Sequence, residues 1–416
     1  MNRRKTKTVS SILSDLSSAK KRTLAYAAVL VLMAAVIIAV MIWNNLNPVG
    51  YTMYNSQSIS YDKGRVVEII EESLQRENEH SNRYLGTQQV LVQMKSGELK
   101  GSQIQVNNIL STDHNIPLGV GDSVIVKVDT PEGVEPFYSI YNYDRTTGIV
   151  IISAIFLLML ILIGKTKGLR SALGIFFTLF FIIEGLLPML YHGYSPILCC
   201  FITVLLTSTV CLTLLTGLSK KTLINLASVL IGIGIVSVFY LIFTQILNLS
   251  GYNSEEAEEL LIISQNTGLN ISQLLFVGVT IASLGAVMDM TMSISSPLFE
   301  MKRLRPDIGF REIVESGLSI GKDMSGTMSQ TLILAFIGSA LTAMLALMSY
   351  GVSFNQFLSS NYMAIEFLHG IIGGTSVIIS IPVTVLLCAW YLCRGKSKHP
   401  LHRSKANKPG TNEENA

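Results

Sequence analysis

The chain has 416 residues, of which 49% are hydrophobic and only 14% are charged, and its formal net charge is +3. Soluble domains carry about a quarter of their residues as charged side chains, so this composition argues against an ordinary soluble protein and favours a bilayer-embedded one. The small net charge, with basic residues clustered beside apolar runs, excludes nucleic acid as an expected partner.

The first apolar run, residues 24–43, contains no charged residue and has the length of about 20 residues that crosses a bilayer. A basic stretch precedes it, as in a secretory signal. The run is longer than the 7–15 apolar residues of such a signal, however, and no small-x-small cleavage site follows. We therefore expect a cytoplasmic basic N-terminus at 1–23 and an uncleaved transmembrane anchor at 24–43. The basic residues are Arg3, Arg4, Lys5, Lys7, Lys20, Lys21 and Arg22.

Residues 44–146 form a large polar region that contains no cysteine. Val124, Val126 and Val128 alternate with other residues there, which is typical of a strand with one buried face. Several such runs separated by turn formers predict a small β domain, a barrel of the OB or SH3 kind, in which residues 72–84 form a polar loop. We expect its strands at 64–71, 88–94, 101–106, 122–128 and 137–143.

Seven further apolar runs follow, each long enough to span a bilayer. Connections that contain Lys or Arg alternate with connections that contain neither, and basic residues are retained on the cytoplasmic side. We therefore expect an α-helical polytopic membrane protein with about eight transmembrane helices, both termini in the cytoplasm and the β domain outside. A seven-helix domain at 147–393 would precede a disordered cytoplasmic tail at 394–416. The runs are 147–164, 171–189, 197–218, 223–246, 272–292, 327–348 and 370–392.

Two of these runs contain an acidic residue, Glu184 in the outer half of 171–189 and Asp289 near the inner end of 272–292. Ionisable groups within spans cost roughly 2.5–3.5 kcal/mol on insertion scales and usually have a function. Asp289 shares a helical face with small residues, which allow another backbone to approach closely. We therefore expect Asp289 to point into a helix contact or a cavity, with headgroup water as the simpler alternative. The residues on that face are Gly278, Ala282, Gly285, Ala286 and Ser293.

The segment before 327–348 begins on the cytoplasmic side, where the run containing Asp289 ends. We expect Asp289, Asp323 and Lys322 to meet in one inner vestibule, with Ser325 and Ser329 supplying hydroxyl groups. Two carboxylates with hydroxyl groups suit a cation, and the lysine would act as a counter-ion. The alternative is a helix start in headgroup water, with Asp323 near the positive helix end.

The last run contains Pro382, with Ser376, Ser380 and Thr384 on one stripe. A proline inside a spanning helix frees the carbonyl of the residue four positions earlier, here Ile378, and such carbonyls coordinate ions in some transporters. A kink that serves only packing is the alternative.

The sequence provides no positive sign of catalysis, of a metal site or of a cofactor. It contains no nucleotide-binding loop, no Gly-x-Ser-x-Gly and no His-Glu-x-x-His, and His114, His192 and His369 are isolated. In the run Met288, Met290 and Met292, only the first and last share a helical face, so packing is a better reading than a copper site.

Two motifs in the apolar region are similar to those of the YibE/F family of bacterial multi-spanning membrane proteins. They are Ser283-Leu-Gly-Ala-Val-Met-Asp-Met-Thr-Met-Ser-Ile294 and Gly321-Lys-Asp-Met-Ser-Gly-Thr-Met-Ser-Gln-Thr-Leu-Ile-Leu-Ala-Phe-Ile-Gly338. The run from Met94 to Gly101 also resembles that family's Gly-rich hairpin. The resemblance implies a permease-like protein in a bacterial plasma membrane, without a settled substrate. It also implies that the shared polar positions are Asp289, Ser293 and Asp323.

We therefore expect a permease-like transporter of a small, ionic solute that binds no cofactor. Asp289 and Asp323 would bind or relay the cation or proton, Lys322 would tune them, and Pro382 would supply a hinge or a free carbonyl. The alternative is a non-transport protein whose β domain binds a partner or an envelope component, with the helices as anchor. A membrane-embedded enzyme is a third, weaker class. Expected partners are the lipid bilayer and a homo- or hetero-oligomer with a related membrane protein.

Overall fold

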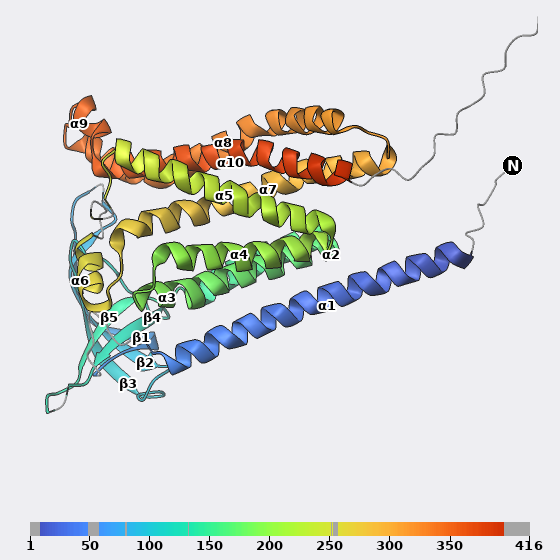
Figure 1. Cartoon of the computed structure of the whole chain (residues 1–416). Coiled ribbons are helices and arrows are strands. Elements are labelled where there is room, and N and C mark those ends of the chain that lie inside the picture. Colours follow the sequence, from blue (N-terminus) through green and yellow to red (C-terminus); the bar gives the residue numbers. More distant parts are fainter. Residues whose placement is uncertain are drawn as a thin grey trace, which may run out of the picture. The chain divides into compact units, whose positions relative to one another are not determined.

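The computed structural model describes residues 9–48, 58–79, 81–131, 133–250, 252 and 257–394. The chain is mostly helical and divides into two compact units, one of Met1–Pro48 with Leu173–Ala416 and one of Val49–Ala172. Figure 1 shows the elements in chain order. The tail predicted as disordered lies outside the described residues beyond Arg394, and so do residues 1–8 of the predicted basic N-terminus.

The second unit contains a five-stranded antiparallel sheet in the order β3-β2-β1-β4-β5. The sheet curls into a half-barrel whose concave face holds the core, because valines alternate along the strands. In β4, for example, Val124 and Val126 are fully buried and Val128 nearly so. The predicted β domain is thus confirmed as a curled sheet. The strands are β1 (Ile59–Arg76), β2 (Tyr84–Met94), β3 (Gln103–Leu110), β4 (Ser123–Asp129) and β5 (Phe137–Tyr143).

Strand β1 is longer than expected: the prediction of a loop over residues 72–84 is wrong for 72–76, which extend β1, and correct for the described residues 77–79 and 81–83. Glu71 to Arg76 pair with Gln89 to Tyr84 across an antiparallel ladder that follows two register shifts. At Gly86, φ is +133°, and a Cβ atom would lie 1.9 Å from the carbonyl oxygen of Ser73. Both faces of this extension meet solvent, so the strand carries no apolar alternation to reveal it.

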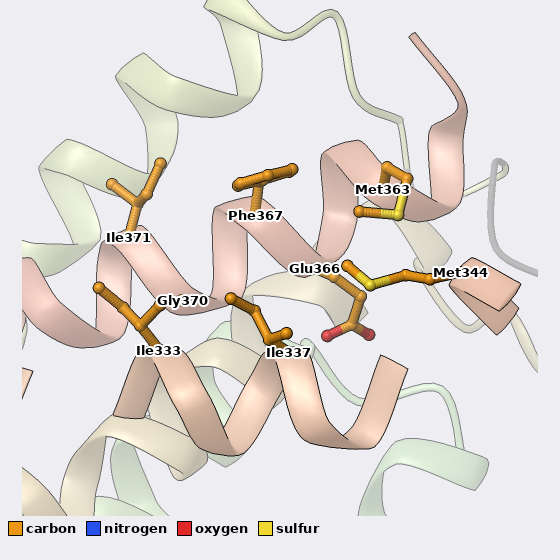
Figure 2. A pocket seen from close by; sticks show the side chains of 8 residues that line it. All are labelled: Ile333, Ile337, Met344, Met363, Glu366, Phe367, Gly370 and Ile371. Atoms are coloured by element: carbon orange, nitrogen blue, oxygen red, sulfur yellow. The ribbon is translucent and has the colours of Figure 1, made fainter. Parts of the chain in front are cut away.

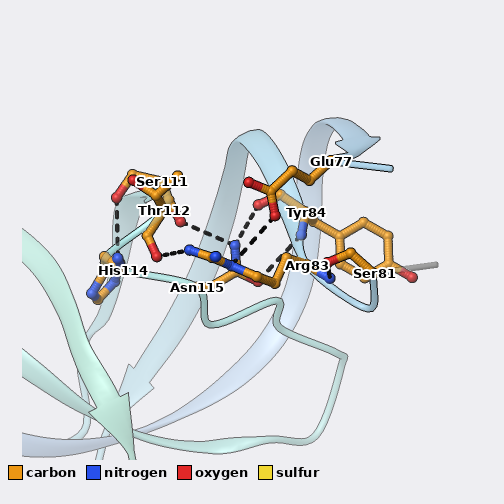
Figure 3. A network of polar contacts seen from close by, with 8 residues as sticks. All are labelled: Glu77, Ser81, Arg83, Tyr84, Ser111, Thr112, His114 and Asn115. Atoms are coloured by element: carbon orange, nitrogen blue, oxygen red, sulfur yellow. Dashed lines mark hydrogen bonds and ion pairs between the residues drawn. The ribbon is translucent and has the colours of Figure 1, made fainter. Parts of the chain in front are cut away.

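Side chains tie the turn between β1 and β2 to the connection that follows β3 (Figure 3). Arg83 donates to the carbonyl of Thr112, and its Nε lies 3.6 Å from a carboxylate oxygen of Glu77. The Asn115 side chain accepts from the Tyr84 N–H at 3.2 Å and donates to the Tyr84 carbonyl at 2.5 Å. These bonds give two irregular segments a fixed place on the sheet.

Twelve helical elements make up the rest of the described chain (Figure 1). Seven helices or helix runs among the described residues are long and apolar enough to cross a membrane. The elements are α1 (Val9–Leu46), α2 (Thr146–Phe180), the π-helix η1 (Phe181–Leu186), α3 (Leu187–Tyr191), α4 (Pro196–Thr216), α5 (Lys220–Ile246), α6 (Ala257–Thr267), the 3₁₀ helix η3 (Ile271–Gln273), α7 (Leu274–Leu304), α8 (Phe310–Ser349), α9 (Phe354–Leu358) and α10 (Asn361–Arg394).

The difference between seven helices and eight predicted spans lies in Thr146–Tyr191, a run of 46 residues that includes two predicted spans. The run is interrupted at Lys165, where φ is 49° and ψ is −128°. A Cβ atom on Gly168 would lie only 2.1 Å from the carbonyl oxygen of Leu160, although residues eight apart in a straight helix are about 12 Å apart. The chain therefore folds back on itself at Lys165, which is where the sequence predicts a connection.

Helix α8 begins at Phe310, 17 residues before the predicted span at 327–348. Ile313, Gly317 and Gly321 are buried four residues apart, so this first part is an amphipathic helix whose narrow stripe packs on the chain. Its charged residues hide the helix from a hydropathy scan. Helix α1 likewise begins at Val9, well before the expected start at residue 24.

Helix α10 packs against α5, α7 and α8. Glycines bring these helices close together: a Cβ atom on Gly317 would lie 2.8 Å from Val385, and one on Gly321 would lie 2.2 Å from Ile381. Van der Waals contact between closely packed helices is what holds helical proteins together in lipid, where the hydrophobic effect contributes little. Helix α10 is thus the central helix of this group.

Candidate functional site

Buried polar side chains gather where α5, α7 and α10 pack together. They come from all three helices, and each is 0% exposed. Buried polar groups are uncommon in an apolar interior because each must keep a hydrogen-bond partner or pay a desolvation cost. We call this set the polar seam: Asn225 and Ser228 of α5, Thr291 and Ser295 of α7, and Ser376, Ser380 and Thr384 of α10.

Two contacts fix how the helices line up along the seam. A Cβ atom on Gly232 would lie 3.7 Å from Val287 of α7 and 4.0 Å from Ser380 of α10. About three turns earlier on α5, Lys221 donates to the hydroxyl of Ser296 on α7 at 2.5 Å. Asn225 and Ser228 lie between these two positions on α5, so the seam residues of the three helices share one stretch of the bundle.

The hydroxyl groups of the seam donate to carbonyl oxygens of their own helices. Ser228 donates to Ile224 at 2.8 Å, Thr291 to Met288 at 2.8 Å, and Ser380 to Val377 at 2.7 Å. A hydroxyl has one donor and two acceptor lone pairs, so these bonds leave the lone pairs free. The seam therefore presents acceptor oxygens to whatever lies within it.

Asn225 is the focus of the seam. Neither its Nδ2 nor its Oδ1 has a hydrogen-bond partner among the described residues, although the side chain is fully buried. Leaving a buried polar group unsatisfied costs about 1–3 kcal/mol. An unpaired amide oxygen and an unpaired amide donor suit a water molecule, a cation or a small polar solute.

Asp289, Lys322 and Asp323, the predicted vestibule residues, lie at similar positions along the helix axes, but their side chains do not pair with one another. Asp289 follows Val287, which lies at the height of Ser380, and Asp323 follows Gly321, which opposes Ile381 on α10. All three predicted residues are exposed, and no hydrogen bond or ion pair connects their side chains in the described part of the chain. The predicted inner vestibule does not form within one chain.

The expected helix contact of Asp289 is not formed within the single chain, and it stays a prediction. Asp289 is exposed, and a Cβ atom added at Gly278 or Gly285 on the same face would meet no atom within 4 Å. Ser293 on this face is half-buried. Sequence spacing predicts which residues share one face of a helix. It does not predict which face packs against other helices.

Pro382 lies inside α10, which continues through it to Arg394. Pro382 and Ile378 are both exposed, whereas Ser376, Ser380 and Thr384 are buried. The proline thus lies on the side of α10 away from the polar seam. The predicted free carbonyl of Ile378 belongs to that side of the helix.

Glu184 is exposed and lies in the π-helix η1, which separates α2 from α3. The side-chain amide of Asn44, at the end of α1, donates to the Glu184 carbonyl at 2.9 Å and to its carboxylate at 3.3 Å. π-Helical turns loosen the backbone ladder and occur often at functional sites. The sequence predicts the acidic residue but not its amide partner.

A second site residue that sequence reasoning missed is Glu366. It lies one turn from His369 in α10, with 3.9 Å between Oε2 and Nδ1, so His369 is not isolated as predicted. The signal is a Glu-x-x-His spacing just before the predicted run 370–392, outside the residues expected to span the membrane. Asn225 was missed because a lone amide in an apolar run gives no pattern.

No group of three His, Cys, Asp or Glu side chains suited to a metal ion occurs among the residues that the structure describes. Met290 is fully buried in one apolar cluster, and Met288 and Met292 pack against another. The methionine run is therefore explained by packing, as the sequence favoured.

The comparison with known families matches residues 152–394 to a family described as YibE/F-like protein. This match includes more than half of the chain. The chain belongs to the YibE/F-like family. The match confirms the resemblance of the two motifs, and together with the apolar helices it indicates a membrane protein.

The part of this YibE/F-like protein that matches the family contains α5, α7 and α10, and therefore the whole polar seam. The five strands and α1 lie outside it. Neither the curated proteins nor the solved structures gave a match to the chain.

Proposed function

We propose that this YibE/F-like protein is a permease-like transporter of a small ion or polar solute, with the polar seam as its solute-binding site. The observation that carries the proposal is the fully buried Asn225 side chain with both of its polar atoms unpaired in the described chain. A protein retains such a costly group when the group binds something. Oxygen atoms of Asn225 and of neighbouring hydroxyl groups would replace part of a solute's hydration shell.

The setting of this proposal is a bacterial plasma membrane crossed about eight times, with both termini in the cytoplasm and the β unit outside. The alternation of basic connections with connections free of Lys and Arg supports it. The sharp fold-back at Lys165 also supports it, because a single run of 46 residues is about twice the length of one crossing.

Asp289 and Asp323 remain candidates for binding or relaying a cation or a proton, with Lys322 as their counter-ion. Their exposed position on α7 and α8 means that this role requires water or another subunit at that face. An oligomer of this chain, or one with a related membrane protein, would supply such a neighbour. A solute or ion would then contact the polar seam and this exposed face one after the other.

The decisive experiment replaces Asn225→Leu in a strain whose growth depends on the protein. We expect growth to fail at normal protein level, because leucine removes the polar atoms from the seam while keeping the volume close. The matched control is Asn266→Leu in α6, where the exposed amide only donates to the Ile262 carbonyl at 2.7 Å. Full growth with Asn225→Leu would contradict the proposal.

A second candidate function is recognition of an envelope component or a partner protein by the β unit. Tyr61 of β1 and Tyr141 of β5 are 53% and 55% exposed, and their ring centroids lie 4.9 Å apart. Exposed aromatic pairs on a sheet are typical of binding surfaces. Replacing both by serine separates the two functions: a binding protein fails to support growth, whereas a transporter whose seam is intact continues to do so.

A further inference from the structure

Glu366, near the beginning of α10, lines a cavity of about 170 Å³ between α10 and α8, and His369 lies one turn later on the same helix. Each of the two side chains is 19% exposed. Figure 2 shows the Glu366 carboxylate pointing from α10 toward the side chains of Ile337 and Met344 on α8. Apart from this carboxylate, the lining is apolar and consists of Ile333, Ile337, Met344, Met363, Phe367, Gly370 and Ile371.

The pair lies at one end of a close contact between α8 and α10. A Cβ atom on Gly373 would lie 3.4 Å from Phe336, and one on Gly374 would lie 3.6 Å from Ser329. The ring of Phe336 covers His369, with 5.6 Å between the ring centroids. The charge state of the pair therefore acts directly on the contact between these two helices.

The neighbouring helices provide no charge to balance this carboxylate. Residues 324–349 of α8, 232–246 of α5 and 274–288 of α7 contain no Asp, Glu, Lys or Arg, and α9 contains none either. The other titratable side chains on these segments and at this end of α10 are Tyr240 of α5 and Tyr362 of α10. An ionised carboxylate without a cation is strongly disfavoured in such surroundings.

The histidine is poorly suited to be that cation. An imidazolium has two N–H donors, and the buried Nε2 of His369 has no acceptor in the described part of the chain. Its other nitrogen, Nδ1, is 3.9 Å from Glu366, beyond hydrogen-bond distance. A neutral imidazole beside a protonated carboxyl group fits this geometry better than an ion pair does.

We propose that Glu366 and His369 form a proton-binding pair, and that the proton on Glu366 is the coupling ion of the transporter. This inference rests on the proposed function. In the arrangement that the structure describes, the proton resides on the carboxyl group and the pair has no net charge. Loss of that proton to water leaves one negative charge in the apolar cavity, which drives α8 away from α10 until water reaches the carboxylate.

The first test is an infrared titration of the purified full-length protein between about pH 4 and 9. We expect the carbonyl band of a protonated carboxyl group to persist at pH 7 and to be missing in Glu366→Gln, which keeps the shape of the side chain. His369→Gln should retain the band and move its midpoint to higher pH, because the carboxylate loses the imidazole that can become protonated beside it once water has entered the cavity. A Glu366 band that disappears near pH 4.3, as for an ordinary glutamate, overturns the proposal.

The second test measures growth of a strain that requires the protein, over a range of external pH. Glu366→Gln, at normal protein level, should abolish the dependence of growth on external pH, whereas Glu258→Gln, at an exposed glutamate of α6, should leave it unchanged. A pH dependence that survives Glu366→Gln overturns the coupling role.

The two proposals fail in different ways. Asn225→Leu should retain the infrared band of Glu366 while growth is lost. Growth that survives Asn225→Leu contradicts the transport site, and the infrared titration still decides whether Glu366 holds a proton. Should Glu366→Gln prevent folding, the upward shift of the band in His369→Gln decides in its place, and an unshifted midpoint counts against the pair.

Discussion

A buried amide without partners is a cost that stability alone does not explain. Both polar atoms of the Asn225 side chain are unpaired within the described chain. The surrounding side chains of the bundle are apolar or donate hydrogen bonds to their own helices. Replacing such a group by an apolar side chain of similar size removes the desolvation cost. At such a residue, the side chain that function requires lowers the stability of the fold.

This opposition gives a prediction for Asn225→Leu. We expect the variant to unfold at a higher temperature than the wild type in detergent, with a gain of about 1–3 kcal/mol. Thermal unfolding followed by circular dichroism measures it, and Asn266→Leu is the surface control. A lower unfolding temperature would mean that the amide is satisfied by structural partners, such as ordered water, and does not await a solute.

In the β unit, Asp144 joins the sheet to the beginning of α2. It accepts from the backbone N–H of Thr146 at 3.0 Å and lies 3.1 Å from Nζ of Lys63. The hydrogen bond with Thr146, followed by that with Lys63, lowers the pKa of Asp144 below its ordinary value of 3.8. A lowered pKa in the folded state means that the ionised carboxylate stabilises the fold above pH 3.8, and that this contribution is lost as the pH falls toward the lowered value.

We therefore predict that Asp144→Asn speeds hydrogen exchange of the β1 and β4 amides at neutral pH, and that this difference from the wild type shrinks in acid. Exchange followed by mass spectrometry on the full chain reports the β unit separately from the helices. Asp113→Asn, at an exposed turn, is the matched control. A difference that is constant down to pH 3 would show that the charge is not what stabilises this junction.

Among the elements, α8 and α10 run antiparallel in a constant register. Gly317 opposes Val385, Gly321 opposes Ile381, and Gly370 opposes Ile333. This register puts the charged first half of α8 beside the apolar second half of α10. The charged side chains of α8, including Lys322 and Asp323, are accordingly exposed on the side away from α10.

The glycines of α8 allow a sharp comparison. In Gly321→Ala the new Cβ atom would lie 2.2 Å from a methyl group of the β-branched Ile381, so we expect a loss of about 1–3 kcal/mol. Gly326→Ala, five residues later, meets no atom within 4 Å and should stabilise the helix by up to about 1 kcal/mol. Thermal unfolding of both variants measures the difference, and equal unfolding temperatures would contradict this packing.

The sequence predicts elements where one strong pattern dominates. Long uncharged runs reveal α4, α5, α7 and α10, and the alternating valines reveal β4, because burial imposes these patterns directly. The sequence fails where two patterns overlap: the charged beginning of α8 masks a helix, and the polar extension of β1 has no buried face. The turn at Lys165 shows in the sequence as the basic residues Lys165, Lys167 and Arg170, and the helical backbone is interrupted at the first of them.

For the whole molecule, the candidate site was harder to predict than the fold because it depends on which helices meet. Asn225 lies in α5, yet the seam residues of α7 and α10 come from segments about 65–70 and 150–160 residues later in the chain. Glu366 and the α8 side chains of its cavity likewise meet only in the folded bundle. Asp289 and Asp323, which the sequence and the family motifs both single out, lie on a face that this chain leaves open.

The topology of the whole chain can be tested at Lys167, which is exposed two residues beyond the fold-back in the run Thr146–Tyr191. With eight crossings, this connection lies in the cytoplasm on the same side as Arg303, whereas Glu98 of the β unit lies outside. We introduce single cysteines, Lys167→Cys, Arg303→Cys and Glu98→Cys, into a variant whose five native cysteines are alanine. A membrane-impermeant maleimide should label Glu98→Cys in intact cells, and the other two only after lysis.

The position at Lys167 separates two ways of placing the same helices. If Thr146–Tyr191 were one tilted crossing, Lys167 would lie in the hydrocarbon region, where a maleimide does not react with it before or after lysis. If the run were two crossings of the opposite sense, Lys167→Cys would be labelled in intact cells and Glu98→Cys only after lysis. Labelling of Lys167→Cys only after lysis, together with Arg303→Cys, requires two crossings that leave from outside and return there. That result fixes the side of the membrane on which each later connection lies, because the crossings after Lys167 alternate in direction.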